Sequence, residues 1–73
     1  MLTVHDFCNA CSDSTEVKLM FFDNFTQEFI TTIILQDAKI GCKGLSACFE
    51  YGTIEALYAS ASIIVCSVYV LNA

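Results

Sequence analysis

The stretch SIIVCSVYVL, residues 62–71, decides the fold of this chain. Apolar side chains occupy its odd and its even positions alike, so a strand formed here is apolar on both faces. β-Branched residues dominate it, and these favour strand over helix. Such a strand lies in the interior of a sheet or turns one face toward a second molecule. The run TIEALYA, residues 53–59, precedes it, separated by Ser60 and Ala61. The two runs predict a C-terminal β-hairpin.

The same region raises the question of a membrane helix, because residues 56–73 carry no charge. Their length is at the lower limit for a helix that spans a bilayer, roughly 17 residues. Three serines interrupt the run, however, and no lysine or arginine flanks it as an anchor. We therefore expect strands here and no membrane contact.

A second hairpin is expected upstream. Two sets of side chains alternate along residues 17–22: Val17, Leu19 and Phe21 in one, and Lys18, Met20 and Phe22 in the other. This alternation is typical of a half-buried strand. Residues 23–27 offer turn-forming side chains, and EFITTIIL, residues 28–35, returns as a second strand rich in β-branched and aromatic residues.

Two helical segments complete the pattern. Thr3 is a predicted N-cap, with Asp6 three residues later in a variant of the capping box. The following apolar residues share one helix face by their spacing: Val4, Phe7, Cys8 and Cys11. Residues 36–44 contain Gly41 and Gly44 and predict a loop or a broken helix. Residues 45–51 predict a helical turn that Gly52 closes in the left-handed conformation.

The element order α-β-β-α-β-β predicts one α+β domain over residues 1–73, a small antiparallel sheet of about four strands with helices packed on one face. A chain this short buries only roughly 60% of the surface that its unfolded form exposes. Because 56% of its residues are apolar, some apolar surface stays exposed or is covered by a partner. We expect a homo-oligomer, a two-fold dimer through the C-terminal strand or the exposed face of the sheet.

The stretch HDFCNAC, residues 5–11, contains the only histidine and two of the five cysteines. A zinc site would need a fourth ligand from Cys42, Cys48 or Cys66, but on a helix His5 and Cys11 lie about 120° apart and do not converge on one ion. A redox pair would need the start of a helix, where the dipole stabilises thiolate. We therefore predict metal-free, buried thiols that act as small apolar groups, with His5 facing solvent.

Catalytic patterns are missing from the sequence. It contains no G-x-S-x-G elbow and no glycine-rich phosphate loop. The eight acidic residues are dispersed, without a close pair suited to acid–base catalysis. We expect no enzyme activity and no cofactor.

Charge restricts the partners. Eight acids, three lysines and no arginine leave a net charge of −5, which disfavours direct binding of nucleic acid and favours a basic protein surface. The N-terminal MLTVHDF lacks a basic segment followed by an apolar core, so no signal peptide is expected. The prediction is a cytoplasmic protein with reduced cysteines.

The pattern T-V-x-x-F-x-x-x-x-S-D-x-T-E-V-K-L, residues 3–19, resembles the start of many small uncharacterised proteins of bacterial phages and mobile elements. The resemblance covers about a quarter of the chain. It implies a location in a bacterial host cell and, by analogy, a protein of the anti-CRISPR type that inhibits a host enzyme.

The leading hypothesis is a small acidic interaction module that occupies the nucleic-acid-binding surface of a host nuclease, most concretely a CRISPR nuclease. The candidate contact residues are Asp23 and Glu28, with Phe25 at the loop tip either as an anchor or packed back onto the sheet. The alternatives are an accessory phage protein that only builds a homo-oligomer, and a small zinc-binding protein.

Overall fold

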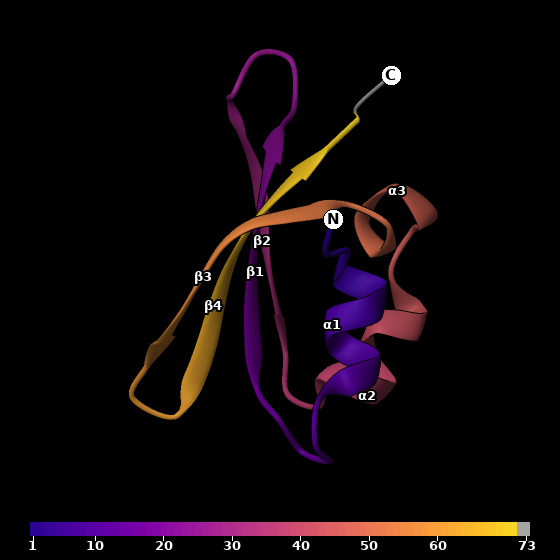
Figure 1. Cartoon of the computed structure of the whole chain (residues 1–73), viewed down its shortest axis with the longest axis vertical. Helices are drawn as coiled ribbons and strands as arrows, with labels where there is room; N and C mark the ends of the chain where they lie inside the picture. Colours follow the sequence, from indigo (N-terminus) through magenta and orange to yellow (C-terminus); the bar gives the residue numbers. More distant parts are fainter. Residues whose placement is uncertain (72–73) are drawn as a thin grey trace.

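The computed structural model describes residues 1–71. Its elements follow along the chain as α1 (Val4–Ala10), β1 (Val17–Asp23), β2 (Phe29–Leu35), α2 (Ala38–Gly41), the 3-10 turn η1 (Cys42–Gly44), α3 (Ala47–Glu50), β3 (Thr53–Ser60) and β4 (Ile63–Val70). The strands form one sheet in the order β2-β1-β4-β3. The helical segments lie together on one side of it (Figure 1). The predicted α+β class, with four strands and helices on one face, is confirmed.

The sheet is mixed, whereas the sequence predicts an antiparallel one. β1 pairs antiparallel with β2, and β3 with β4, but β1 and β4 are parallel. The cause is the segment between β2 and β3. Its helical turns carry the chain from the end of β2 back along the length of the sheet before β3 begins (Figure 1). β4 therefore runs in the same direction as β1.

The interior position predicted for the C-terminal strand is confirmed. β4 is paired with β1 on one side and with β3 on the other. It has no free edge to which a second chain could add, so a dimer could use only a face of this strand. Residues 56–70 lie in strands and a tight turn, as expected. No helix among residues 1–71 is long and apolar enough to cross a membrane.

The core lies between the helices and one face of the sheet. Val17, Leu19 and Phe21 are fully buried there, and they pair in register with residues 64, 66 and 68 of β4. The ring of Phe49 in α3 stacks on Phe21 with the centroids 4.2 Å apart. This stacking fixes α3 to the sheet.

α1 forms as its sequence predicts. The Oγ1 atom of Thr3 accepts a hydrogen bond from the backbone N–H of Asp6 at 3.1 Å, which caps the first turn. Val4 and Cys8 are fully buried, and Phe7 packs against the same cluster. The apolar stripe of α1 therefore faces the sheet.

Gly52 has a different role from the predicted one. None of the glycines has a positive φ angle, so Gly52 does not close α3 in the left-handed conformation. Instead, a Cβ atom at this position would lie 2.7 Å from the Cγ1 atoms of both Val68 and Val70. Glycine is required because the chain passes directly over β4 at the start of β3.

Candidate functional site

The face of the sheet that carries no helix presents a row of aromatic rings. Phe29, Phe22 and Tyr69 occupy neighbouring register positions on β2, β1 and β4. The Phe22 ring meets Phe29 edge-on at 5.7 Å and stacks on Tyr69 at 5.3 Å. Phe29 is 55% exposed. The row is held in place by its own ring contacts, with Phe22 and Tyr69 partly buried and Phe29 accessible to a partner.

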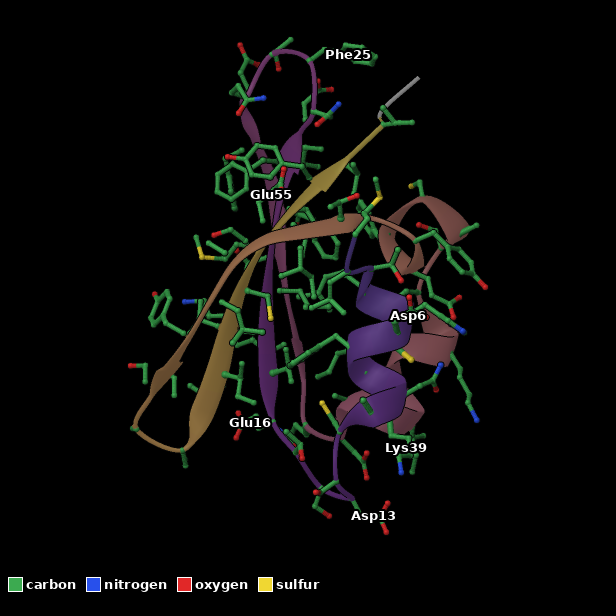
Figure 2. The ribbon with its side chains drawn as sticks, viewed as in Figure 1. Asp6, Asp13, Glu16, Phe25, Lys39 and Glu55 are labelled. Atoms are coloured by element: carbon green, nitrogen blue, oxygen red, sulfur yellow. The ribbon has the colours of Figure 1, made fainter. Side chains whose placement is uncertain are left out.

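The β1–β2 hairpin turns at the same end of the sheet, and the three residues predicted from the sequence lie there, with Asp23 as the last residue of β1 and Phe25 and Glu28 in the loop. Asp23 shapes the loop, because its Oδ1 atom accepts hydrogen bonds from the backbone N–H groups of Phe25 at 2.8 Å and Thr26 at 3.0 Å. Phe25 is 76% exposed at the tip of the loop and points away from the sheet (Figure 2). Glu28 is exposed where the loop returns to β2. Of the two arrangements considered for Phe25, the outward one is present.

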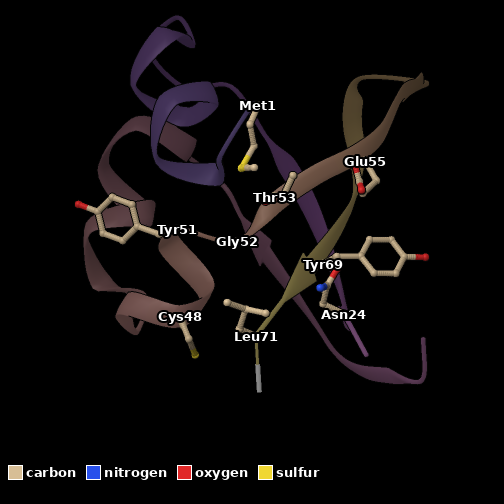
Figure 3. A pocket seen from close by; sticks show the side chains of 9 residues that line it. All are labelled: Met1, Asn24, Cys48, Tyr51, Gly52, Thr53, Glu55, Tyr69 and Leu71. Atoms are coloured by element: carbon tan, nitrogen blue, oxygen red, sulfur yellow. The ribbon is translucent and has the colours of Figure 1, made fainter. Parts of the chain in front are cut away.

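A cavity of about 480 Å³ opens beside the aromatic row. Thr53 and Glu55 of β3, Tyr69 of β4 and Asn24 of the loop contribute to its lining. Glu55, Tyr69 and Asn24 lie on one side of the cavity, whereas Tyr51 and Cys48 lie on the other (Figure 3). Its size is in the range that accepts a side chain or a small ligand.

The charges around this end are negative. We call the region the aromatic–acidic end; it comprises Phe22, Asp23, Phe25, Glu28, Phe29, Glu55 and Tyr69. The three lysines of the chain lie elsewhere, with Lys18 at the start of β1, Lys39 in α2 and Lys43 in η1. Aromatic faces next to carboxylates are suited to the ammonium and guanidinium groups of Lys and Arg.

His5 makes a defined set of contacts, although the sequence predicts that it faces solvent. Its Nδ1 atom donates to Glu50 Oε2 at 2.7 Å, and its Nε2 atom lies 3.1 Å from the amide nitrogen of Asn9, which can donate to it. The His5 ring also stacks on Tyr51 at 5.1 Å. With both ring nitrogens engaged, His5 links α1 to α3.

Four of the five cysteines, including the two in HDFCNAC, lie in the core or pack against it. Cys8, Cys42 and Cys66 are fully buried, and Cys11 is half-buried. Burial, followed by the neighbouring Cys42 and Cys11 thiols, raises the pKa of Cys8 to about 12. Burial likewise raises the pKa of Cys66 to about 11. Protonated thiols are poor nucleophiles and poor metal ligands. Within residues 1–71, no three His, Cys, Asp or Glu side chains are arranged to hold a metal ion.

Four residues of this region were not predicted as site residues from the sequence: Phe22, Phe29, Tyr69 and Glu55. The sequence contains a signal for Phe22. Together with Lys18 and Met20, it lies on the face of β1 opposite the buried side chains of residues 17, 19 and 21. Both faces of β1 are therefore largely apolar, which a strand with one solvated face does not need. The contact between Phe22 and Tyr69 depends on the parallel pairing of β1 with β4, which the sequence does not reveal.

Comparison with protein-family models, with curated protein sequences and with solved structures finds no match to this chain.

Proposed function

We propose that this protein is an interaction module that binds a basic partner protein through its aromatic–acidic end. The supporting observation is the combination of two exposed rings, Phe25 at the loop tip and Phe29 in the aromatic row, with carboxylates from three segments of the chain. An exposed ring such as Phe25 costs free energy in water and regains it when it enters a pocket on a partner. The acidic side chains disfavour an acidic partner and increase the rate of encounter with a basic one.

The partner class that fits best is an enzyme whose basic groove normally holds nucleic acid, with a bacterial CRISPR nuclease as the most concrete example. A groove of this kind is lined by Lys and Arg side chains. Phe25 projects from the molecule at the tip of a narrow hairpin (Figure 2). A projecting hairpin that carries an aromatic tip and acidic flanks has the shape needed to enter a groove and block it. In this proposal the protein acts as an inhibitor in the cytoplasm of the host cell.

The experiment is a nuclease protection assay with purified nucleic-acid enzymes. Phe25→Ala and Glu28→Lys should each weaken inhibition about tenfold or more, the level of a hot-spot residue. Asp13→Lys is the matched control for Glu28→Lys, because Asp13 is an exposed acid at the opposite end of the molecule (Figure 2). It should inhibit as the parent does. Inhibition should also weaken as salt is raised, since exposed charges are screened.

Two results would contradict the proposal. One is that the parent protein protects no nucleic acid from any enzyme tested. The other is that Asp13→Lys weakens inhibition as much as Glu28→Lys, which would point to net charge alone. Asp23 is not used in the test, because its hydrogen bonds to the loop make a change there structural.

A further inference from the structure

The outer edge of β3 is occupied along only half of its length. Near its start, Val4 N–H donates to Gly52 C=O at 3.0 Å and Ile54 N–H donates to Leu2 C=O at 2.8 Å. Thr3 and Thr53 form the antiparallel bridge between these two bonds. The N-terminal segment thus acts as a short additional strand. Beyond it, within the described residues, residues 56–60 of β3 pair only with β4.

We call residues 56–60 the free half of β3. The hairpin geometry shows which of its backbone N–H and C=O groups point away from β4. β3 and β4 are joined by a loop of two residues, and Ser60 pairs with Ile63 across it. The pair that flanks such a loop exchanges hydrogen bonds, and the pattern then alternates along the strand. Leu57 and Ala59 therefore direct their N–H and C=O groups away from β4. The bulge between Ile54 and Ala56 shifts the alternation, which explains why the Ile54 N–H also points outward.

The free half of β3 lacks the residues that normally keep an edge strand from pairing with another chain. Residues 56–60 contain no charge and no proline, the devices that usually protect an edge strand. On this edge strand Leu57 is 47% exposed and Tyr58 is 57% exposed. Glu55, the nearest charge on the strand, sits at the bulge where the covered half ends.

The occupant that fits this edge is a second copy of this chain, because an antiparallel two-fold pair uses the same unprotected, uncharged edge twice. A net charge of −5 opposes the association of two copies, so a stable contact has to keep the acids of the two copies apart. The free half of β3 meets this condition. The edge of β2 does not, because Glu28 precedes it and Asp37 follows it. An antiparallel pairing of two β2 strands would bring Glu28 of each copy close to Asp37 of the other.

We propose that two copies pair antiparallel through the free half of β3, with Tyr58 on the two-fold axis. In this register Leu57 of one copy lies opposite Ala59 of the other, so the outward-pointing groups form two hydrogen-bonded pairs with about four bonds. The two Tyr58 side chains face each other in the closer, non-hydrogen-bonded pair between them. The result is one continuous sheet of twice the width.

This arrangement places both helix-free faces on the same side of the dimer. The reason is that a two-fold axis that relates antiparallel neighbouring strands stands perpendicular to the sheet. The dimer therefore presents two aromatic–acidic ends on one surface. The inference about the dimer does not depend on which partner those ends bind.

Analytical ultracentrifugation at micromolar concentration tests the proposal. The parent should sediment with twice the 8.0 kDa mass of the chain. Tyr58→Lys should raise the dissociation constant at least tenfold, because it brings two cations together on the axis. Thr32→Lys is the matched control, since Thr32 is also an exposed position on the helix-free face of an edge strand. It should leave the dimer intact.

A second variant distinguishes loss of pairing from loss of folding. Ala59→Pro removes an outward N–H but no bond to β4, so the chain should stay folded by circular dichroism and yet become monomeric. A monomeric parent overturns the proposal. A dimer that Thr32→Lys dissociates and Tyr58→Lys does not overturns it as well.

Disulfide trapping tests the register. The background is Cys48→Ser, because Cys48 is the exposed native thiol. In that background Tyr58→Cys should form a cross-linked dimer on oxidation, since Cα atoms in a closer pair lie about 4.5 Å apart. Thr32→Cys should not cross-link. A dimer that resists cross-linking at position 58 would contradict the Tyr58 register.

Discussion

The two faces of the sheet have a similar content of apolar residues, but the helical segments cover only one of them. On the covered face, Val17, Leu19 and Phe21 are completely buried beneath the helical segments. On the open face, Met20 and Phe22 of the same strand remain partly exposed. The helices of a chain with 73 residues cover only one face, since burying both would need a further layer. Apolar residues on the covered face therefore stabilise the fold, whereas those on the open face are available for contact.

The largest effect is expected from comparing one phenylalanine on each face. Phe21→Ala should lower the free energy of unfolding by about 3–5 kcal/mol, because it leaves a cavity under Phe49. Phe29→Ala should cost only about 1 kcal/mol, the contribution of its ring contact with Phe22. Urea denaturation at a fixed protein concentration measures both. Equal losses would show that the open face is part of the core.

The second prediction concerns the close approach at Gly52. Gly52→Ala should destabilise the protein by about 1–3 kcal/mol, because the new methyl group collides with Val68 and Val70 on the covered face. Gly44→Ala is the control, since nothing lies within 4 Å of a Cβ atom there, and it should not destabilise. Thermal unfolding of the two variants compares them directly. If Gly52→Ala is as stable as Gly44→Ala, the packing of the chain over β4 is looser than described.

The buried thiols on the covered face should make stability fall at alkaline pH. The folded protein retains the Cys8 proton up to a pKa of about 12, whereas an ordinary thiol loses it near 9. Between these values the unfolded chain binds fewer protons, so the free energy of unfolding falls as pH rises, and Cys8 alone contributes at most about 1.4 kcal/mol per pH unit to this slope. Urea midpoints measured from pH 8 to about pH 10 should show this slope.

The contribution of Cys8 is isolated by comparison with Cys8→Ala. The variant should be less stable at pH 8 and should lose less stability as the pH rises. An identical slope in parent and variant would contradict the raised pKa. Alkylation provides a parallel measurement, in which Cys48 should react in the folded protein while Cys8 and Cys66 react only on unfolding.

The smallest effect is expected at the hairpin turn, which lies beyond the helix layer. Ala61 has a φ angle of 55°, as in the type II′ turn, whose first central position favours glycine. Ala61→Gly should therefore stabilise the protein by about 0.5–1 kcal/mol. Ala56→Gly, in the neighbouring strand, should cost a similar amount. A destabilised Ala61→Gly protein would contradict the assigned turn geometry.

Local features of the fold were predictable from the sequence because they depend on neighbouring residues. The Thr3 cap and the buried stripe of α1 follow from spacing along one helix, and the two hairpins follow from alternation and turn residues. The interior position of β4 follows from its two apolar faces. For the same reason, the turn chemistry of residues 23–27 is enough to place Phe25 in a loop, although Asp23 is the last residue of β1 and β2 begins at Phe29, one residue after Glu28.

The tertiary structure alone decided the features that depend on contacts between distant segments. Whether β4 lies parallel or antiparallel to β1 depends on how far the chain travels between β2 and β3. That pairing brings Phe22 against Tyr69 and so creates the aromatic row. The need for glycine at position 52 likewise arises from Val68 and Val70, sixteen and eighteen residues later in the sequence. Sequence periodicity reports which way a side chain points within its own element, whereas only the assembled sheet determines what it meets there.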